Sequence, residues 1–103
     1  MEKKKSVFEP LDTNPAYYDD WEFRVRMLLN RKGCINAIKS DRPIPNATNS
    51  DEVEVFDERD RQALGYITQH ITDSALSKVK DFTTSAKSMW DTLKSSYVET
   101  SKH

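Results

Sequence analysis

The sequence predicts an all-α fold, a compact bundle of four to five helices. Every apolar segment repeats with a period near 3.6 residues, which is the period of an α-helix, and none alternates as a half-buried strand does. Only two glycines occur in the 103 residues, too few for a set of tight β-hairpins. Hydrophobic residues make up 36% and charged residues 32% of the chain, a balance typical of one globular domain with a single core.

The longest predicted element is a central helix over residues 50–71. Asn49 or Ser50 is expected to cap its first turn with a side-chain oxygen, ahead of two acids at the positive end of the helix dipole. We expect the other helices to pack against the apolar face of this helix. Six residues at helical spacing form that face: Val53, Phe56, Ala63, Leu64, Ile67 and Ile71.

Two residues interrupt the pattern of the central helix. Gly65 costs about 1 kcal/mol relative to alanine in a helix interior, so we expect a second helix to cross close to its backbone. Asp60 projects within the apolar face, where an ionised carboxylate needs a partner. The Trp21 indole N–H, a tyrosine hydroxyl or Arg24 could serve, and such a carboxylate more often ends in a hydrogen bond or ion pair than in catalysis.

An extended arm is expected over residues 1–13, with Phe8 and Leu11 as its apolar anchors. A first helix should follow from Pro15 to about Lys32, because Asn14 is a good cap and proline is tolerated in the first turn. A basic last turn and Gly33 end this helix. Its core face consists of five apolar residues: Tyr18, Trp21, Val25, Leu28 and Leu29.

Phe23 and Met27 do not fit the core face of the first helix, since they lie one turn apart on nearly its opposite side. Two accounts compete. In one, the arm folds back and covers this apolar pair with its two anchors. In the other, the pair is an interface for a neighbouring copy or a partner, and Arg24 and Arg26 set the register by charge.

The remaining elements are shorter. Residues 34–39 should form a short helix or a single turn, and the proline-rich residues 40–49 should form the longest loop, which we interpret as a mobile connector rather than a functional loop. Thr72 and Asp73 can cap a short helix that carries Ala75, Leu76 and Val79. After a break at residues 82–84, a last helix should bury one face: Ala86, Met89, Trp90, Leu93 and Tyr97.

Several functional classes find no support in the sequence. Cys34 is the only cysteine, the two histidines are not spaced to hold a metal, and no phosphate-binding loop or nucleophile motif occurs, so we expect no enzymatic activity, metal or cofactor. The net charge of −1 predicts only weak RNA binding, through the lysines of residues 3–5. Without an apolar run or a secretory signal, we expect no membrane contact and a cytoplasmic location.

Two aromatic motifs occur in a defined order. The first is Tyr-x-x-Trp at residues 18–21, followed by Phe-Arg-x-Arg-x-Leu-Leu at residues 23–29. The second is Ala-x-x-x-Trp-Asp-x-Leu at residues 86–93, closing on Tyr97. With the aromatic Phe56 and the apolar positions between the motifs, this order resembles the amino-terminal region of Gag proteins from copia-type LTR retrotransposons, over about residues 8–98.

The resemblance implies a fold like the amino-terminal lobe of a retroviral capsid over residues 14–98, with residues 99–103 as a tail or linker to a second lobe that this sequence does not include. It also implies self-association with other Gag copies into virus-like particle shells that enclose element RNA. The alternative is a domesticated Gag-derived lobe that binds a peptide or protein. In both cases the interface expected from the sequence comprises Phe23, Met27, Arg24, Arg26, Phe8 and Leu11.

Overall fold

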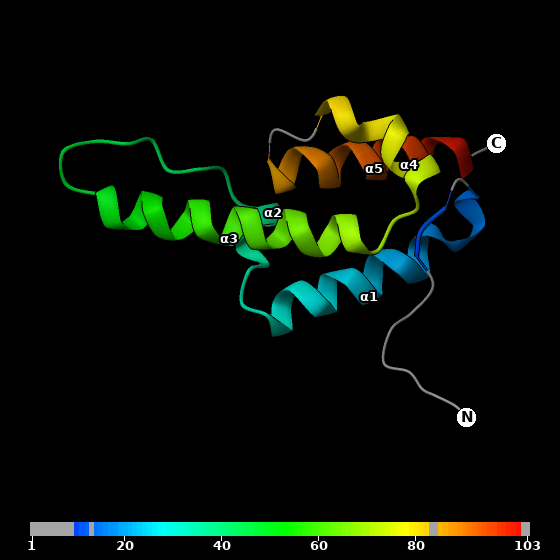
Figure 1. The fold of residues 1–103 in the computed structure, drawn as a ribbon, viewed down its shortest axis with the longest axis horizontal. Coiled ribbons are helices and arrows are strands. Elements are labelled where there is room, and N and C mark those ends of the chain that lie inside the picture. The colour runs from blue at the N-terminus through cyan, green and yellow to red at the C-terminus, as the bar shows by residue number, and fades with distance from the viewer. Residues whose placement is uncertain (1–9, 13, 83–84, 102–103) are drawn as a thin grey trace.

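The computed structural model describes residues 10–12, 14–82 and 85–101, and within these ranges it is helical with no strand beyond a single isolated bridge. The predicted all-α class is therefore confirmed. Three long helices, α1, α3 and α5, lie one above the other, and α4 packs over α5 (Figure 1). The helical elements are η1 Pro15–Tyr17, α1 Tyr18–Arg31, α2 Asn36–Lys39, α3 Ser50–Gln69, α4 Asp73–Val79, η2 Lys80–Phe82 and α5 Ala86–Ser101.

Aromatic side chains from α1 and α5 meet in the core. The Trp21 and Trp90 rings stack with centroids 5.8 Å apart, and the Tyr18 and Tyr97 rings stack at 5.5 Å. All four side chains are buried, as the two predicted helix faces require. The predicted face of the last helix is confirmed in full, because each of its five members is buried.

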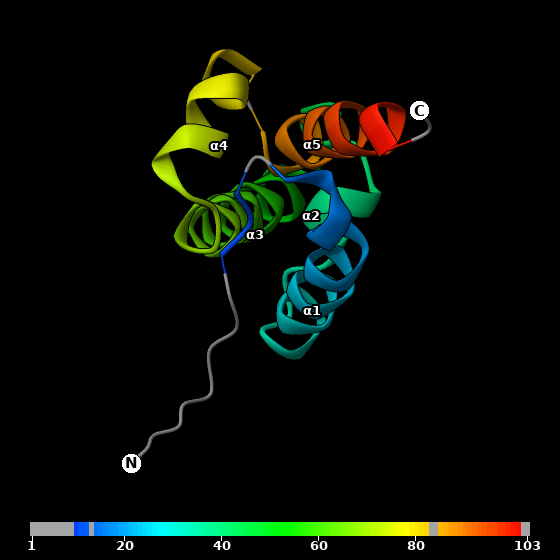
Figure 2. The same ribbon diagram turned by 90° about the vertical axis from the view of Figure 1, so that its right-hand side faces the viewer.

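The arm contributes one core residue and an extended hydrogen-bonded segment. Leu11 is 1% exposed and forms a parallel bridge with Ile71, in which Leu11 N–H donates to the His70 carbonyl at 2.8 Å and Thr72 N–H donates to the Leu11 carbonyl at 2.9 Å. The Tyr97 hydroxyl donates to the Asp12 carbonyl at 2.6 Å. Figure 2 shows this part of the arm against the end of α3. Residues 10–12 thus connect the α3–α4 junction to α5.

Two predicted helix ends, at Gly33 and Thr72, are confirmed, and Asn14 caps a helical turn as predicted, although this turn is the 3-10 helix η1 and α1 itself begins at Tyr18. Asn14 Oδ1 accepts from Ala16 N–H at 2.9 Å, and Thr72 Oγ1 accepts from Ala75 N–H at 3.2 Å. Gly33 has a positive φ of 77°, the left-handed conformation that ends α1. Arg59 from α3 donates to the Gly33 carbonyl and so adds a cation at the negative end of the α1 dipole.

The expected cap of the central helix is wrong. Asn49 is the N-cap residue, but its side chain makes no capping hydrogen bond. Its Oδ1 accepts from Asn46 N–H at 2.8 Å, and its Nδ2 donates to the Ile44 carbonyl at 3.0 Å. The amide therefore closes the end of the loop, because the loop backbone competes for the same side chain. At the other end α3 stops at Gln69, two residues before the predicted end, since Ile71 enters the bridge with the arm.

The expected close helix crossing at Gly65 is also wrong. A Cβ atom built on Gly65 would meet no heavy atom within 4 Å outside its own helix neighbourhood. The packing of α3 against its neighbours therefore does not depend on the missing side chain. We have no structural reason for the glycine at this position.

Asp60 has a partner that the sequence did not suggest. Its Oδ1 accepts a hydrogen bond of 2.7 Å from Ala86 N–H, the first backbone amide of α5. Two of the expected partners are engaged elsewhere: Trp21 Nε1 donates to the His70 carbonyl at 2.6 Å, and Arg24 pairs with Asp20. Because Ser85 Oγ accepts from Ser88 N–H at 3.0 Å, two side chains satisfy free N–H groups at the start of α5.

Replacing Asp60 by alanine is expected to lower the free energy of unfolding by about 1 to 2 kcal/mol. The variant removes both the acceptor of Ala86 N–H and an anion at the positive end of the α5 dipole. Chemical denaturation followed by circular dichroism measures the loss. Asp60→Asn is the matched control, since it keeps an acceptor oxygen and should lose less; equal losses in the two variants would contradict the capping role.

Candidate assembly surface

The outer face of α1 carries an exposed apolar pair. Phe23 is 53% exposed and Met27 37% exposed, while Trp21, Val25 and the rest of the buried side of the helix face the core. The end-on view shows α1 at the edge of the bundle, packed on one side only (Figure 2). The prediction that these two residues lie off the core face is therefore confirmed.

Charged side chains border the pair and hold its position. The Arg26 guanidinium lies 5.5 Å from the centroid of the Phe23 ring, a cation–π distance. Arg26 also pairs with Glu22 at 3.1 Å, and Arg24 pairs with Asp20 at 3.6 Å. Both ion pairs are between residues four apart on the exposed helix surface, where such pairs contribute a few tenths of a kcal/mol. Breaking these two ion pairs costs little free energy. Arg24 and Arg26 can therefore exchange their acidic partners on α1 for acids of another protein.

Of the arm anchors, only one is described. Leu11 lies in the core beside Ile71, so it does not extend over the exposed pair and has almost no surface to offer a partner. Phe8 lies outside the described residues. The structure therefore brings four of the six sequence-predicted site residues together on α1: Phe23, Arg24, Arg26 and Met27.

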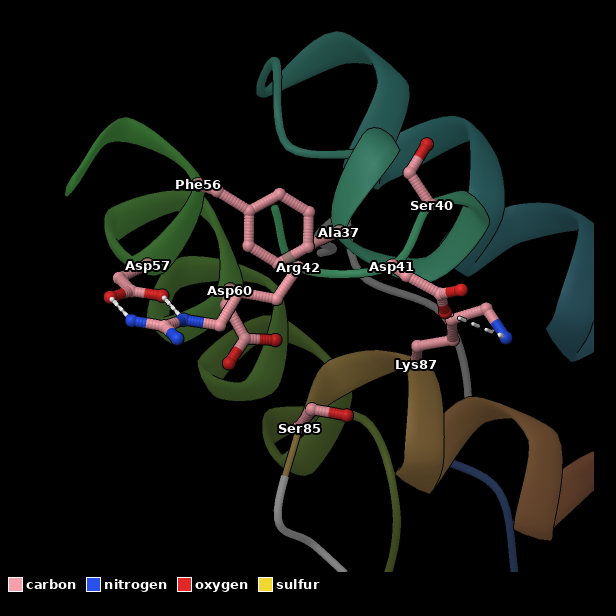
Figure 3. A pocket seen from close by; sticks show the side chains of 9 residues that line it. All are labelled: Ala37, Ser40, Asp41, Arg42, Phe56, Asp57, Asp60, Ser85 and Lys87. Atoms are coloured by element: carbon pink, nitrogen blue, oxygen red, sulfur yellow. Dashed lines mark hydrogen bonds and ion pairs between the residues drawn. The ribbon is translucent and has the colours of Figure 1, made fainter. Parts of the chain in front are cut away.

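A second feature is a cleft of about 240 Å³ between the end of α2, the middle of α3 and the start of α5. Figure 3 shows Arg42 reaching across to Asp57 and Lys87 lying beside Asp41, with the Phe56 ring as one apolar wall. The Arg42–Asp57 pair is bidentate, with N···O distances of 2.8 and 3.0 Å. This pair attaches the loop of residues 40–49 to α3.

Two of the three acids that line the cleft, Asp57 and Asp41, form ion pairs with its two bases, Arg42 and Lys87. The hydrogen bond from Arg42 holds the pKa of the Asp57 carboxyl below its usual range, so Asp57 stays ionised at neutral pH. Lys87 pairs with Asp41 at 3.7 Å and with Asp91 at 3.4 Å. Such an arrangement fixes the loop and the start of α5. Among the described residues, no group of three or more His, Cys, Asp or Glu side chains is placed to hold a metal.

Sequence reasoning missed a third exposed apolar residue on a long helix. Val55 is 53% exposed on α3. The signal was present, because Val55 falls outside the apolar face of α3 just as Phe23 falls outside that of α1. It was overlooked because it is flanked by acids and has no apolar neighbour one turn away on the same face.

The described part of the chain is a small all-α domain, and its distinguishing feature is the exposed apolar pair Phe23 and Met27 on the outer face of α1. Residues 25–103 match the family described as the gag-polypeptide of LTR copia-type, and because this match covers most of the chain, the chain belongs to that family. No curated protein and no solved structure shows significant similarity to it. The resemblance to copia-type Gag proteins is confirmed over residues 25–103, which include the second aromatic motif, and the match supports a structural role of the Gag type.

The structure also limits where a functional site can lie among the described residues. Within the described residues, no helix combines the length and apolarity needed to cross a bilayer. The buried apolar side chains form one main core, and among the exposed ones Phe23 and Met27 are the only two that lie one turn apart on the same helix of the described residues, whereas Ile44 is in the loop of residues 40–49. The outer surface of α1 is therefore the candidate functional site.

Proposed function

We propose that this chain is a capsid building block, which associates with further copies of itself into the shell of a virus-like particle around element RNA. The observation that carries the proposal is the exposed pair Phe23 and Met27 on the outer face of α1, in a chain of the copia-type Gag family. An apolar centre with an arginine border is the usual composition of a protein–protein interface.

The modest size of the apolar pair suits a shell. Two side chains cannot supply the area of a permanent dimer, so each contact formed by this surface is weak. In a closed assembly every copy has several such contacts at once. The high effective concentration of neighbouring copies then compensates for the low affinity of each single contact. Weak contacts also allow misplaced copies to dissociate before a shell closes.

We propose that RNA contributes little to association through this chain. Acids slightly outnumber bases, with a net charge of −1, whereas a domain that binds through phosphates gains affinity from a basic surface. Contacts between copies are therefore expected without nucleic acid. We also propose a cytoplasmic location, as expected from the sequence.

The purified chain should self-associate as its concentration is raised to the millimolar range. Sedimentation velocity and light scattering should show a rising average mass, and electron microscopy of concentrated samples should show particles or regular fragments of shells. Nuclease treatment should leave the association unchanged. A strictly monomeric chain over the whole range would overturn the proposal and would favour the alternative, a lobe that binds a peptide or another protein.

A further inference from the structure

A three-residue segment of the arm lies against the helical bundle and inserts a single side chain into it. Leu11, in the middle of residues 10–12, is 1% exposed, whereas Pro10 and Asp12 on either side of it are exposed. Leu11 is also the only described residue before α1 that belongs to the main core cluster. The segment therefore adds one leucine to a core that later parts of the chain otherwise form.

Hydrogen bonds to Leu11 and Asp12 hold the segment in place. Leu11 N–H donates to the His70 carbonyl at 2.8 Å, and Thr72 N–H donates to the Leu11 carbonyl at 2.9 Å. Thr72 Oγ1 also donates to Asp12 Oδ1 at 2.8 Å, and the Tyr97 hydroxyl donates to the Asp12 carbonyl at 2.6 Å. We call the residues that hold the segment the arm slot, at the end of α3 in Figure 2: His70, Ile71, Thr72 and Tyr97.

These contacts define the kind of segment that fits the arm slot. Main-chain hydrogen bonds on both sides of one residue are the pattern by which an extended peptide adds to a free backbone edge, and they do not depend on sequence. Specificity comes from the buried Leu11 side chain and from the Thr72 hydroxyl, which donates to the carboxylate of the next residue. The arm slot therefore fits an extended segment in which leucine is followed by an acidic residue.

We propose that the arm slot takes residues 10–12 from a second copy when copies associate, so that neighbouring chains exchange arms. This inference rests on the proposed self-association and adds one of its contacts. A second copy is the occupant because leucine is followed by an acidic residue at one place only in this chain, at Leu11 and Asp12, and a second copy brings that same segment. The exchanged segment makes the same hydrogen bonds and buries the same side chain, as in any domain swap.

Concentration decides which arm fills the slot. Because the copy's own segment and the exchanged segment make the same contacts, the outcome depends on the effective concentration of each arm at the slot. The copy's own arm is linked through the chain, which gives it an effective concentration on the order of millimolar, so it fills the slot in dilute solution. In an assembly the arms of neighbouring copies reach a similar local concentration, and exchange then competes.

Reciprocal exchange closes a symmetrical pair of copies, because each copy gives one arm and receives one. Such a pair does not grow by this contact alone, since both of its slots are filled. Phe23 and Met27 do not belong to the arm slot, so they remain exposed and available to join one pair to the next. Arm exchange and the α1 surface together supply two different contacts, as a closed shell of pairs requires.

Disulfide trapping tests the exchange. Asp12→Cys and Thr72→Cys place thiols at two side chains whose oxygen atoms lie 2.8 Å apart, so a disulfide between them reports an arm in a slot. The native Cys34 is buried, and burial raises the pKa of its thiol, so it stays protonated and unreactive. When the two substitutions are in different chains, this disulfide forms only between copies. The two whole chains, one with a mass tag, are mixed where the wild type associates, oxidised and separated on a denaturing, non-reducing gel.

Exchange predicts a mixed dimer of the Asp12→Cys and Thr72→Cys chains. The matched control replaces Thr72→Cys by Ser77→Cys, since Ser77 is exposed on α4 but outside the arm slot, and it should give only the background of random collisions. Adding Leu11→Ala to the Asp12→Cys chain should lower the yield of mixed dimer roughly tenfold, because the buried anchor is shortened. Leu11→Met keeps the volume of the anchor and should preserve the yield.

Sedimentation velocity of the wild type separates the fate of the exchange from that of the proposed function. If the wild type associates but the mixed dimer does not exceed the Ser77→Cys control, or is unchanged by Leu11→Ala, the exchange is overturned and the proposed function stands. Capture of a free peptide of residues 7–13 carrying Asp12→Cys, but never of a second chain, would also overturn the exchange and would make the slot a site for another protein. A wild type that never associates would overturn both.

Discussion

Trp21→Ala is expected to lower the free energy of unfolding by about 3 to 5 kcal/mol, the usual cost of deleting a buried aromatic side chain. Trp21 is 3% exposed, stacks on Trp90 at 5.8 Å and packs against Tyr18 at 6.0 Å. Its removal leaves a cavity between α1 and α5. A domain of this size has a total stability of about 5 to 15 kcal/mol, so the variant retains little margin.

The Trp21 indole also donates a hydrogen bond, and Trp21→Phe separates the contribution of this hydrogen bond from that of core packing. Trp21 Nε1 donates to the His70 carbonyl, the same carbonyl that accepts from Leu11 N–H in the bridge with the arm. Phenylalanine keeps an aromatic ring in the core but cannot donate, so it should lose clearly less stability than alanine. Urea denaturation of the wild type, Trp21→Ala and Trp21→Phe, monitored by circular dichroism, measures both losses of unfolding free energy. A loss below 1 kcal/mol for Trp21→Ala would contradict the placement of this side chain in the core.

The helices and their buried faces could be predicted from the sequence because they depend on local spacing. The last helix shows this, since Met89, Trp90 and Leu93 lie at helical spacing whatever they pack against, and all three are buried. End signals that act within a few residues were equally readable, as the left-handed Gly33 and the capping Thr72 demonstrate.

Partners distant in the sequence could not be predicted. Asp60 caps a helix that begins 26 residues later, and nothing near Asp60 in the sequence announces that Ala86 N–H will be free at that point. Asn49 had two acceptable uses, as a helix cap or as a loop closure, and propensity alone does not rank them. Gly65 suggested close packing by its cost, yet the structure leaves open space there.

Only the part of the candidate site that depends on local helical spacing could be predicted from the sequence. Phe23 and Met27 stood out because they contradict the period of their own helix, and the structure leaves them exposed. Leu11 was assigned to the same surface but is buried beside Ile71, because a short extended segment has no period that reveals its direction. Val55 lies outside the apolar face of α3 in the sequence, but only the structure shows that it is exposed.

Replacing Phe23 and Met27 together by serine is expected to abolish self-association while leaving the fold intact. Both side chains lie on the solvent side of α1, so their loss creates no cavity, and the unfolding free energy should change by less than about 1 kcal/mol. The loss of association should be nearly complete, because each contact in an assembly depends on its few apolar anchors. Sedimentation velocity and thermal melting of the same preparation provide the two readings.

The matched control is Tyr17→Ser, which removes another exposed aromatic residue, 67% exposed, from the 3-10 turn that precedes α1. It should associate like the wild type. If the double variant instead loses several kcal/mol of unfolding free energy, Phe23 and Met27 are covered in solution. Phe8 is then the candidate cover, as in the account in which the arm folds back over the pair. If stability and association both survive, the outer face of α1 is neither core nor interface, and the contact between copies must be sought on another face of the bundle.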